Sequence, residues 1–321
     1  MMMNNAEFLN TTQNFENLME RADQIQSMCK DFKVPAGSIR MTEDINLKFD
    51  DQELPLSQLA TGHLCGKLNV PSRYFTRLVD AHQKALAAAN VNCWLENDER
   101  NLFLRSYAGM IRGVLSGSYS VYDAPEILAT VKEVFDPEKF VLKGSFINQE
   151  RLHLRLIQKE MLNVEDEDLY AGISLDSSDV GRSGLTVKFF IWKKVCTNGL
   201  VLAKSNAVLF RQKHIGITHD EFAEGLREGL EKFETIKEKV AVSINETRKI
   251  PVNEDLEALM EEVKTATNLS DQATEKVIQL MQIKYAPNKW GLINGITEVA
   301  QEFTLETRLQ LEEIAGNMLV S

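Results

Sequence analysis

Residues 140–158, FVLKGSFINQERLHLRLIQ, decide the fold of this 321-residue chain. In the second half of the stretch, leucines alternate with His153 and Arg155, and a period of two is typical of a half-buried strand. An apolar run of similar length precedes it, separated by the polar pair Asn148-Gln149. Two such runs around a tight connection predict an antiparallel β-hairpin.

The same period continues toward the carboxyl terminus. Residues 169–175 and 185–195 predict a second pair of strands, and the polar, glycine-rich residues 176–184 predict an exposed loop between them. The triplet Thr197-Asn198-Gly199 predicts a turn into an apolar run at 200–202, because Asn-Gly is a strong turn signal.

Helical patterns lie on both sides of these strands. Residues 1–90 are predicted to be mainly helical, with a short strand at 45–49, and a further helix with Asp123 as its cap is predicted inside the sheet region. After residue 217 the period returns to 3.6, and Thr218 with Glu221 forms a capping box. Further helices are predicted at about 56–68, 73–89, 253–266, 271–284, 290–302 and 304–319.

These elements predict an α+β fold with a mostly antiparallel central sheet, an N-terminal helical segment and a C-terminal helical bundle. We expect three regions: a mainly helical region at 1–90, the antiparallel sheet core at 91–215 and a helical region at 216–321.

The composition is that of an ordinary soluble globular protein, with 44% hydrophobic and 26% charged residues. No run approaches the roughly 18 apolar residues of a membrane span, and the stretch Met1-Met2-Met3-Asn4-Asn5 lacks the basic start and apolar core of a secretion signal. The four cysteines are scattered and form no CxxC pair, as expected for free thiols in a reducing compartment. We therefore expect a cytoplasmic protein without membrane contact.

The charge is unevenly distributed along the chain. The net charge is −11, which argues against bulk attraction to nucleic acid. However, residues 180–219 and 101–122 contain no Asp or Glu, and together they hold nine Lys and Arg. The depletion of acids in strands explains this pattern equally well, so a functional basic face and an ordinary sheet remain open.

Motifs for catalysis are weak. The sequence lacks a phosphate-binding glycine loop, and His63-x-Cys65 provides too few ligands for a structural zinc site, so we predict no metal and no cofactor. A hydrolase would have to be built on Cys196 and His214, although a buried structural thiol is the commoner outcome. The sequence therefore contains no convincing catalytic motif.

Binding of single-stranded nucleic acid has better support. It requires cations that follow the phosphates and aromatic rings that stack on bases, and the acid-free stretches interleave both. The candidate contacts are Arg105, Arg112, Tyr119, Lys188, Trp192, Lys193, Lys194, Lys204, Arg211 and Lys213. Contacts from about six bases would give a salt slope of roughly −4. Alternatively, the aromatic rings point into the core and the lysines reach outward without binding anything.

The two short helices around Asn69-Val70-Pro71 also permit a helix-turn-helix interpretation. The second helix begins Ser72-Arg73-Tyr74-Phe75, with large apolar groups where base-contacting polar side chains are needed. A packed helical hairpin is the better prediction.

Three blocks of sequence resemble a family of phage and plasmid-like proteins known mainly as a domain of unknown function. They are the Leu-Ser-x-x-Tyr-x-x-x-Asp core at 115–123, preceded by Arg105, the Val-Cys-Thr-Asn-Gly block at 195–199, and Trp-x-x-x-Asn-x-x-Thr-Glu at 290–298. The third block has Gly295 where the family usually has alanine. The resemblance spans about residues 55–319 and implies a cytoplasmic mobile-element protein, but no reaction.

Hairpins followed by a long helix are also similar in layout to phage single-strand annealing proteins, which assemble into rings on DNA. We therefore expect a DNA-associated protein of a phage or plasmid that binds single-stranded DNA and forms homo-oligomers, possible roles being recombination and annealing. Two alternatives stay open: an acidic interaction or inhibitor protein that acts on a host partner, and the Cys196-dependent hydrolase.

Overall fold

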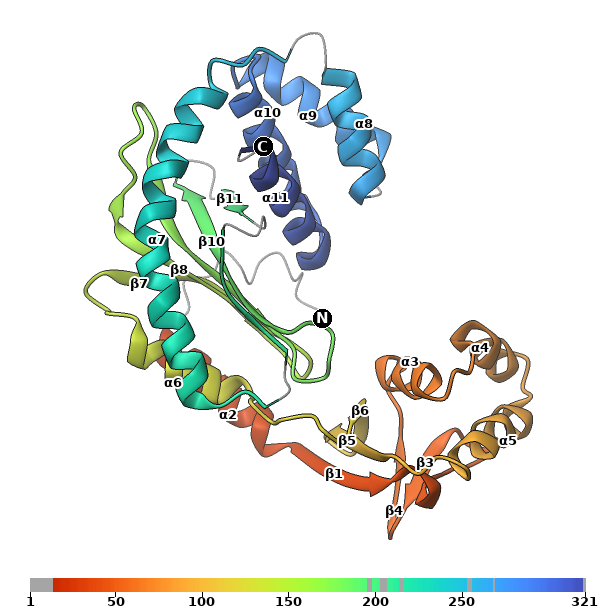
Figure 1. Cartoon of the computed structure of the whole chain (residues 1–321). Coiled ribbons are helices and arrows are strands. Elements are labelled where there is room, and N and C mark those ends of the chain that lie inside the picture. Colours follow the sequence, from red (N-terminus) through yellow and green to blue (C-terminus); the bar gives the residue numbers. More distant parts are fainter. Residues whose placement is uncertain are drawn as a thin grey trace.

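The computed structural model describes residues 14–194, 198–202, 207–213, 216–252, 256–267 and 269–319. Figure 1 shows an arched molecule with a curved antiparallel sheet at its centre, a small amino-terminal body at one end and carboxyl-terminal helices at the other. The predicted α+β class is confirmed.

The large sheet is six-stranded, with the order β11-β10-β9-β8-β7 and with β12 also paired to β10. The predicted hairpin is confirmed, because β7 and β8 pair in antiparallel register from Phe140 opposite Gln158 to Ile147 opposite Leu152. The strands are β7 (Phe140–Ile147), β8 (Leu152–Met161), β9 (Leu169–Ser177), β10 (Leu185–Lys193), β11 (Asn198–Val201) and β12 (Val208–Gln212).

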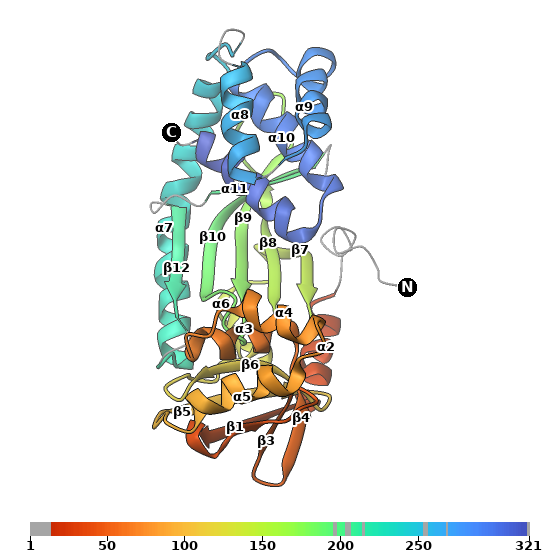
Figure 2. The same cartoon turned by 90° about the vertical axis from the view of Figure 1, so that its right-hand side faces the viewer.

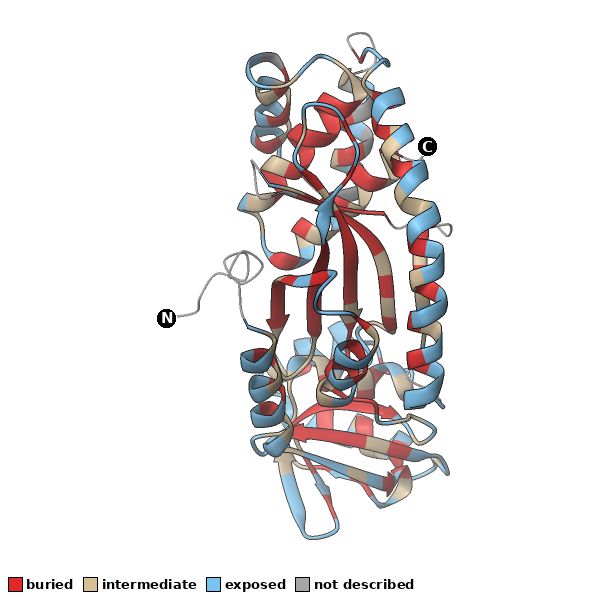
Figure 3. Ribbon diagram, turned by 90° about the vertical axis from the view of Figure 1, so that its left-hand side faces the viewer, coloured by how far each residue is buried: buried red, intermediate tan, exposed pale blue. Residues whose placement is uncertain are grey.

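One face of this sheet, which we call the first face, forms the main hydrophobic core. It carries the leucines of β8 and packs on α7 (His219–Thr247), whose Phe233 ring lies 5.0 Å from the Phe189 ring of β10. The predicted capping box of Thr218 and Glu221 starts α7. The helices α2 (Phe15–Ser27) and α6 (Ala124–Val134) extend the same core. Figure 3 shows the buried strands beside α7, which exposes its outer side.

The carboxyl-terminal helices lie at the far end of the sheet. Figure 2 shows α11 crossing the end of the strands, with α8 and α9 beyond it. These helices are α8 (Leu256–Thr267), α9 (Asp271–Ile283), α10 (Lys289–Val299) and α11 (Leu305–Leu319), with a 3-10 turn, η3 (Ala300–Glu302), before the last.

The small body has its own hydrophobic core, built from residues between Val34 and Val114. It contains two three-stranded sheets, with the orders β1-β5-β6 and β2-β3-β4. Its elements are β1 (Cys29–Pro35), η1 (Ala36–Ser38), β2 (Arg40–Met41), β3 (Asn46–Phe49), β4 (Gln52–Pro55), α3 (Gln58–Lys67), α4 (Ser72–Asp80), α5 (Lys84–Leu95), β5 (Asn101–Tyr107) and β6 (Met110–Ser116).

The small body differs in detail from the sequence prediction. The strands β5 and β6, expected in one sheet core at 91–215, belong to the small body instead. The helix expected at 73–89 is two helices, α4 and α5, because the chain turns through His82 with a φ of 58°. Phe75 and Leu78 of α4 are buried, so α3 and α4 form a packed helical hairpin.

Thr197 of the predicted Thr197-Asn198-Gly199 turn lies outside the described residues, and the prediction is wrong for Asn198 and Gly199. Both residues lie in β11, where they pair with Lys193 and Trp192 of β10. A side chain at Gly199 would place its Cβ 2.5 Å from the Phe190 ring and 2.8 Å from Arg155, so close packing between strands requires this glycine. Cys196 lies outside the described residues.

Candidate nucleic-acid interface on the large sheet

The opposite face of the large sheet, which we call the second face, carries polar residues where a buried sheet normally carries apolar ones. Strand register arranges them in two rows, because alternate residues of neighbouring strands share a face. The outer row is His153, Asp176, Thr186 and Arg211, and the inner row is Arg155, Ser174 and Lys188.

The inner row anchors α11 to the sheet. Arg155 is buried and forms an ion pair with Glu312 of α11, which also accepts a hydrogen bond of 3.0 Å from Arg308 Nε. The Arg155 guanidinium lies 4.5 Å from the centroid of the Phe190 ring. Breaking such a buried pair leaves an uncompensated charge, so this cluster fixes the position of α11.

The outer row contains a buried carboxylate with several partners. Arg151 Nε lies 2.6 Å from Asp176 Oδ1, and Ser183 Oγ donates to Asp176 Oδ2 at 2.9 Å. Burial opposes the charged form of Asp176, but the interactions with His153 and Arg151 outweigh it and lower the carboxyl pKa to about 2. Asp176 is therefore ionised at neutral pH.

His153 is the unusual member of the outer row. Its side chain has no exposed surface, and burial lowers its pKa to about 4, so the ring is neutral at pH 7. Nδ1 lies 3.5 Å from Asp176 Oδ1, yet neither ring nitrogen makes a hydrogen bond to a described residue. Since buried polar groups are normally hydrogen-bonded, this ring has unused capacity.

A cavity of about 410 Å³ lies between the outer row and α11. Arg211 and Lys213 are exposed at it, and neither has a carboxylate within ion-pair distance in the described part of the chain. Lys188 forms an ion pair with Glu313 of α11. The described residues that line the cavity are Arg151, His153, Ser174, Asp176, Ser183, Gly184, Thr186, Lys188, Val201, Arg211, Gln212, Lys213, Leu309 and Glu313.

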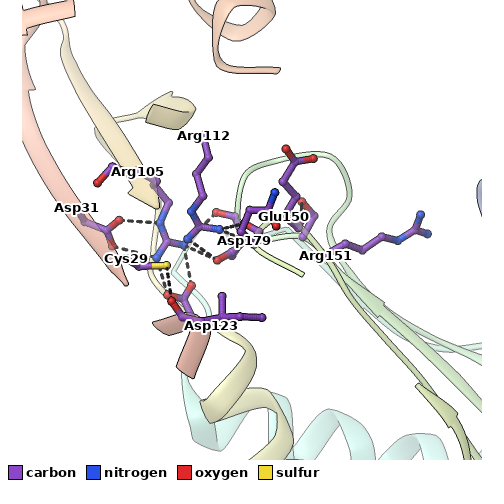
Figure 4. Close-up of polar contacts among 12 residues, drawn as sticks. Cys29, Asp31, Arg105, Arg112, Asp123, Glu150, Arg151 and Asp179 are labelled. Carbon is purple, nitrogen blue, oxygen red and sulfur yellow. Dashed lines mark hydrogen bonds and ion pairs between the residues drawn. The ribbon is translucent and has the colours of Figure 1, made fainter. Parts of the chain in front are cut away.

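Arg105 does not join this face. It lies at the junction between the small body and the large sheet, where it is fully buried (Figure 4). Its guanidinium holds Asp31 of β1 at 2.9 Å and Asp123, at the start of α6, at 2.5–2.7 Å. Burial opposes its charge, but these carboxylates outweigh that effect and raise its pKa. Arg105 therefore cannot contact a phosphate in this structure.

Arg112 is buried at the same junction. It makes two contacts of 2.8 Å with Asp179, which follows β9. Tyr119 is half-buried, with its ring 5.9 Å from the Phe103 ring and 5.9 Å from the Arg105 guanidinium, and burial raises its pKa. The prediction that these two residues are open to DNA is corrected, because Asp179 pairs with Arg112 and because Phe103 and Arg105 pack against the Tyr119 ring.

The remaining candidates lie at the other end of β10. Trp192 is buried, 5.5 Å from the Tyr170 ring, with Lys143 Nζ 3.8 Å above it, so it is a core residue and not an open stacking surface. Lys193 Nζ lies 2.7 Å from Glu167 and 2.8 Å from Asn294. Lys194 is exposed. Lys204 and His214 lie outside the described residues.

The structure thus brings together three of the predicted contacts: Lys188, Arg211 and Lys213. Sequence reasoning missed Arg151, His153 and Asp176. A signal was present in β8, where leucines alternate with His153 and Arg155. Both polar residues are buried, so the pattern indicates a polar group inside the protein.

A family model described as Domain of unknown function (DUF932) matches residues 112–314, more than half of the chain. The chain belongs to this family. The DUF932 match includes all the described residues that line the cavity, whereas Arg105 precedes it. No curated protein and no solved structure matches the chain.

The described residues contain neither a membrane-spanning helix nor a metal-ligand cluster. Their helices do not combine the length and the apolar character that a bilayer crossing requires. Within the same residues, no three His, Cys, Asp or Glu side chains converge as metal ligands would.

Proposed function

We propose that the protein binds single-stranded DNA on the second face of the large sheet, as a DNA-associated protein of a phage or plasmid that acts in recombination or annealing. One observation carries this proposal: Arg211 and Lys213, both without an ion-pair partner among the described residues, lie at the rim of a polar cavity. Arg151 and Lys188 line the same cavity, where they are paired with Asp176 and Glu313, and a phosphate would have to compete with these carboxylates.

The cavity favours a single strand over a duplex. Leu309 and Glu313 of α11 stand on one side of it and strands of the sheet on the other. A space of about 410 Å³ holds a nucleotide-sized group but not a turn of double helix. A single chain can follow the sheet edge between these walls.

Electrostatics should dominate the affinity. Tyr119 and Trp192 are engaged inside the protein, so they provide no open stacking surface. If Arg151, Lys188, Arg211 and Lys213 each neutralise one phosphate, the logarithm of affinity should fall against the logarithm of salt with a slope of about −3. This value is smaller than the slope expected from the sequence.

The decisive test is the double variant Arg211→Glu/Lys213→Glu, measured by fluorescence anisotropy with a labelled oligonucleotide at several salt concentrations. The slope should lose about 1.4, which corresponds to two single-strand contacts. The matched control is Lys84→Glu/Lys139→Glu, which makes the same charge change at exposed lysines outside the cavity.

An equal loss in both variants would show that only net charge matters, and the proposed surface would be rejected. Absence of DNA binding by the unaltered protein, with one stoichiometric partner recovered from a host lysate, would favour the interaction-protein alternative.

A further inference from the structure

The cavity beneath α11 has the chemistry of a site for a doubly charged phosphate. Its described lining contains four cations, Arg151, Lys188, Arg211 and Lys213, and two carboxylates, Asp176 and Glu313. The excess of two positive charges matches a phosphate monoester, which carries nearly two negative charges at neutral pH. An internal phosphodiester of a strand carries only one.

Uncharged donors complete this site. The hydroxyl groups of Ser174 and Thr186 stand in adjacent rows on the same face as the cations, and Thr186 Oγ1 donates only a long hydrogen bond of 3.4 Å to the Gly184 carbonyl. His153, fully buried at the cavity, presents a neutral ring whose two nitrogens have no hydrogen-bond partner among the described residues. The single N–H of the neutral imidazole can point either to Asp176 Oδ1, 3.5 Å from Nδ1, or into the cavity, where phosphate oxygens are strong acceptors. The site therefore contains an unpartnered polar group as well as excess positive charge.

We propose that this cavity binds a phosphate monoester, and that on DNA its ligand is the phosphorylated end of a strand. This inference rests on the proposed function, because the same cations would guide the strand. A strand bound by its end leaves the space between the sheet and α11 in one direction only. A strand bound by an internal phosphate has to leave this space in two directions. Arg211 and Lys213 at the rim would contact the following phosphates.

Two oligonucleotides of the same sequence test this inference, one with a 5′-phosphate and one with a 5′-hydroxyl, each labelled at the other end. A second pair with 3′-phosphate or 3′-hydroxyl identifies which end is recognised. The phosphorylated form of one pair should bind at least tenfold more tightly. Inorganic phosphate and dAMP, added as competitors, distinguish the group alone from the group on a strand.

A variant separates this site from the strand-binding surface. Ser174→Ala/Thr186→Val removes two donors without changing charge or much volume, so it should reduce the ratio of the affinities for the phosphorylated and hydroxyl oligonucleotides at least threefold. Arg211→Glu/Lys213→Glu should weaken binding of all forms. Histidine NMR gives a second measurement that needs no variant, since the His153 ring signals should shift with the phosphorylated form and not with the hydroxyl form.

The outcomes are distinguishable. If phosphate or dAMP abolishes the preference for the phosphorylated end, the site binds the monoester group alone. If the preference persists, the site recognises the monoester only as part of a strand. Equal affinity for phosphorylated and hydroxyl ends, with the salt slope still dependent on Arg211 and Lys213, would overturn this inference and keep the proposed function. Absence of oligonucleotide binding would overturn both.

Discussion

Arg105 and Arg211 come from similar acid-free stretches of sequence but have opposite environments. Arg105 is fully buried between Asp31 and Asp123, whereas Arg211 is exposed at the cavity rim without an ion-pair partner among the described residues. Two of the three acids that neutralise the junction lie just outside the stretches: Asp123 follows residue 122, and Asp179 precedes residue 180. A charge count along a window therefore says little about which cations remain free after folding.

The largest expected effect is a loss of stability when the ion-pair cluster at the junction is broken. Arg105→Gln leaves Asp31 and Asp123 without their guanidinium partner, and removing one member of a buried ion pair costs about 3–5 kcal/mol. Urea unfolding of the variant should show this loss. The matched control, Arg227→Gln, removes a pair with Glu133 that is exposed on both sides and should cost about 1 kcal/mol or less. An equal loss in free energy of unfolding in the two variants would show that the Arg105 cluster is no more important for stability than an exposed ion pair.

The next effect concerns His153 at the cavity. Its folded pKa of about 4 is below the ordinary value of 6.5, so between these pH values the folded state binds fewer protons than the unfolded state. The free energy of unfolding should therefore fall by about 3 kcal/mol as the pH falls from 6.5 to 4. Asp176, with a pKa of about 2, stays ionised throughout this window, and Arg151 and Arg155 stay charged.

His153→Gln isolates this contribution. Unfolding curves of the variant and the unaltered protein, recorded at several pH values, should differ in slope between pH 6.5 and 4. Parallel curves would mean that the imidazole is accessible to protons in the folded state, and the neutral buried ring would be disproved.

A smaller effect separates binding from stability. Arg211→Gln should reduce the salt slope by about 0.7 and change the free energy of unfolding by less than about 0.5 kcal/mol, because the side chain is exposed. Arg112→Gln should instead lower the free energy of unfolding, because its largely buried partner Asp179 loses this ion pair. It should leave the salt slope unchanged, because no phosphate contact is lost. A change of salt slope in Arg112→Gln would contradict the division between the two regions.

The smallest effect is expected at Lys194. This exposed residue lies eight positions along the strand from Thr186, about 26 Å at 3.3 Å per residue. Lys194→Gln should leave both the slope and the stability unchanged in the same anisotropy and unfolding experiments. A slope reduced by about 0.7 would instead show that the bound strand follows the whole length of β10.

Much of the fold could be predicted from local patterns. The leucines of β8 and the capping box of α7 are signals that a few neighbouring residues determine, and both predictions are confirmed. The Asn198-Gly199 turn failed because contacts across strands decided it: Gly199 sits against Phe190 and Arg155, where no side chain fits. Packing between the strands therefore outweighed the turn preference of the Asn-Gly pair.

The site was harder to predict, for a related reason. Asp31 neutralises Arg105 from 74 positions away, and this pairing has no signature in either segment alone. Conversely, His153 and Asp176 face each other only through the register of β8 with β9. Alternation predicted which residues share a face of one strand, but not which residues meet across several strands.

The ion pair of Lys188 with Glu313 joins groups separated by 125 positions. A ribosome therefore produces the strands of the cavity well before the helix that covers them. The cavity that we propose as a binding site is therefore complete only after Leu309 and Glu313 of α11 have been synthesised.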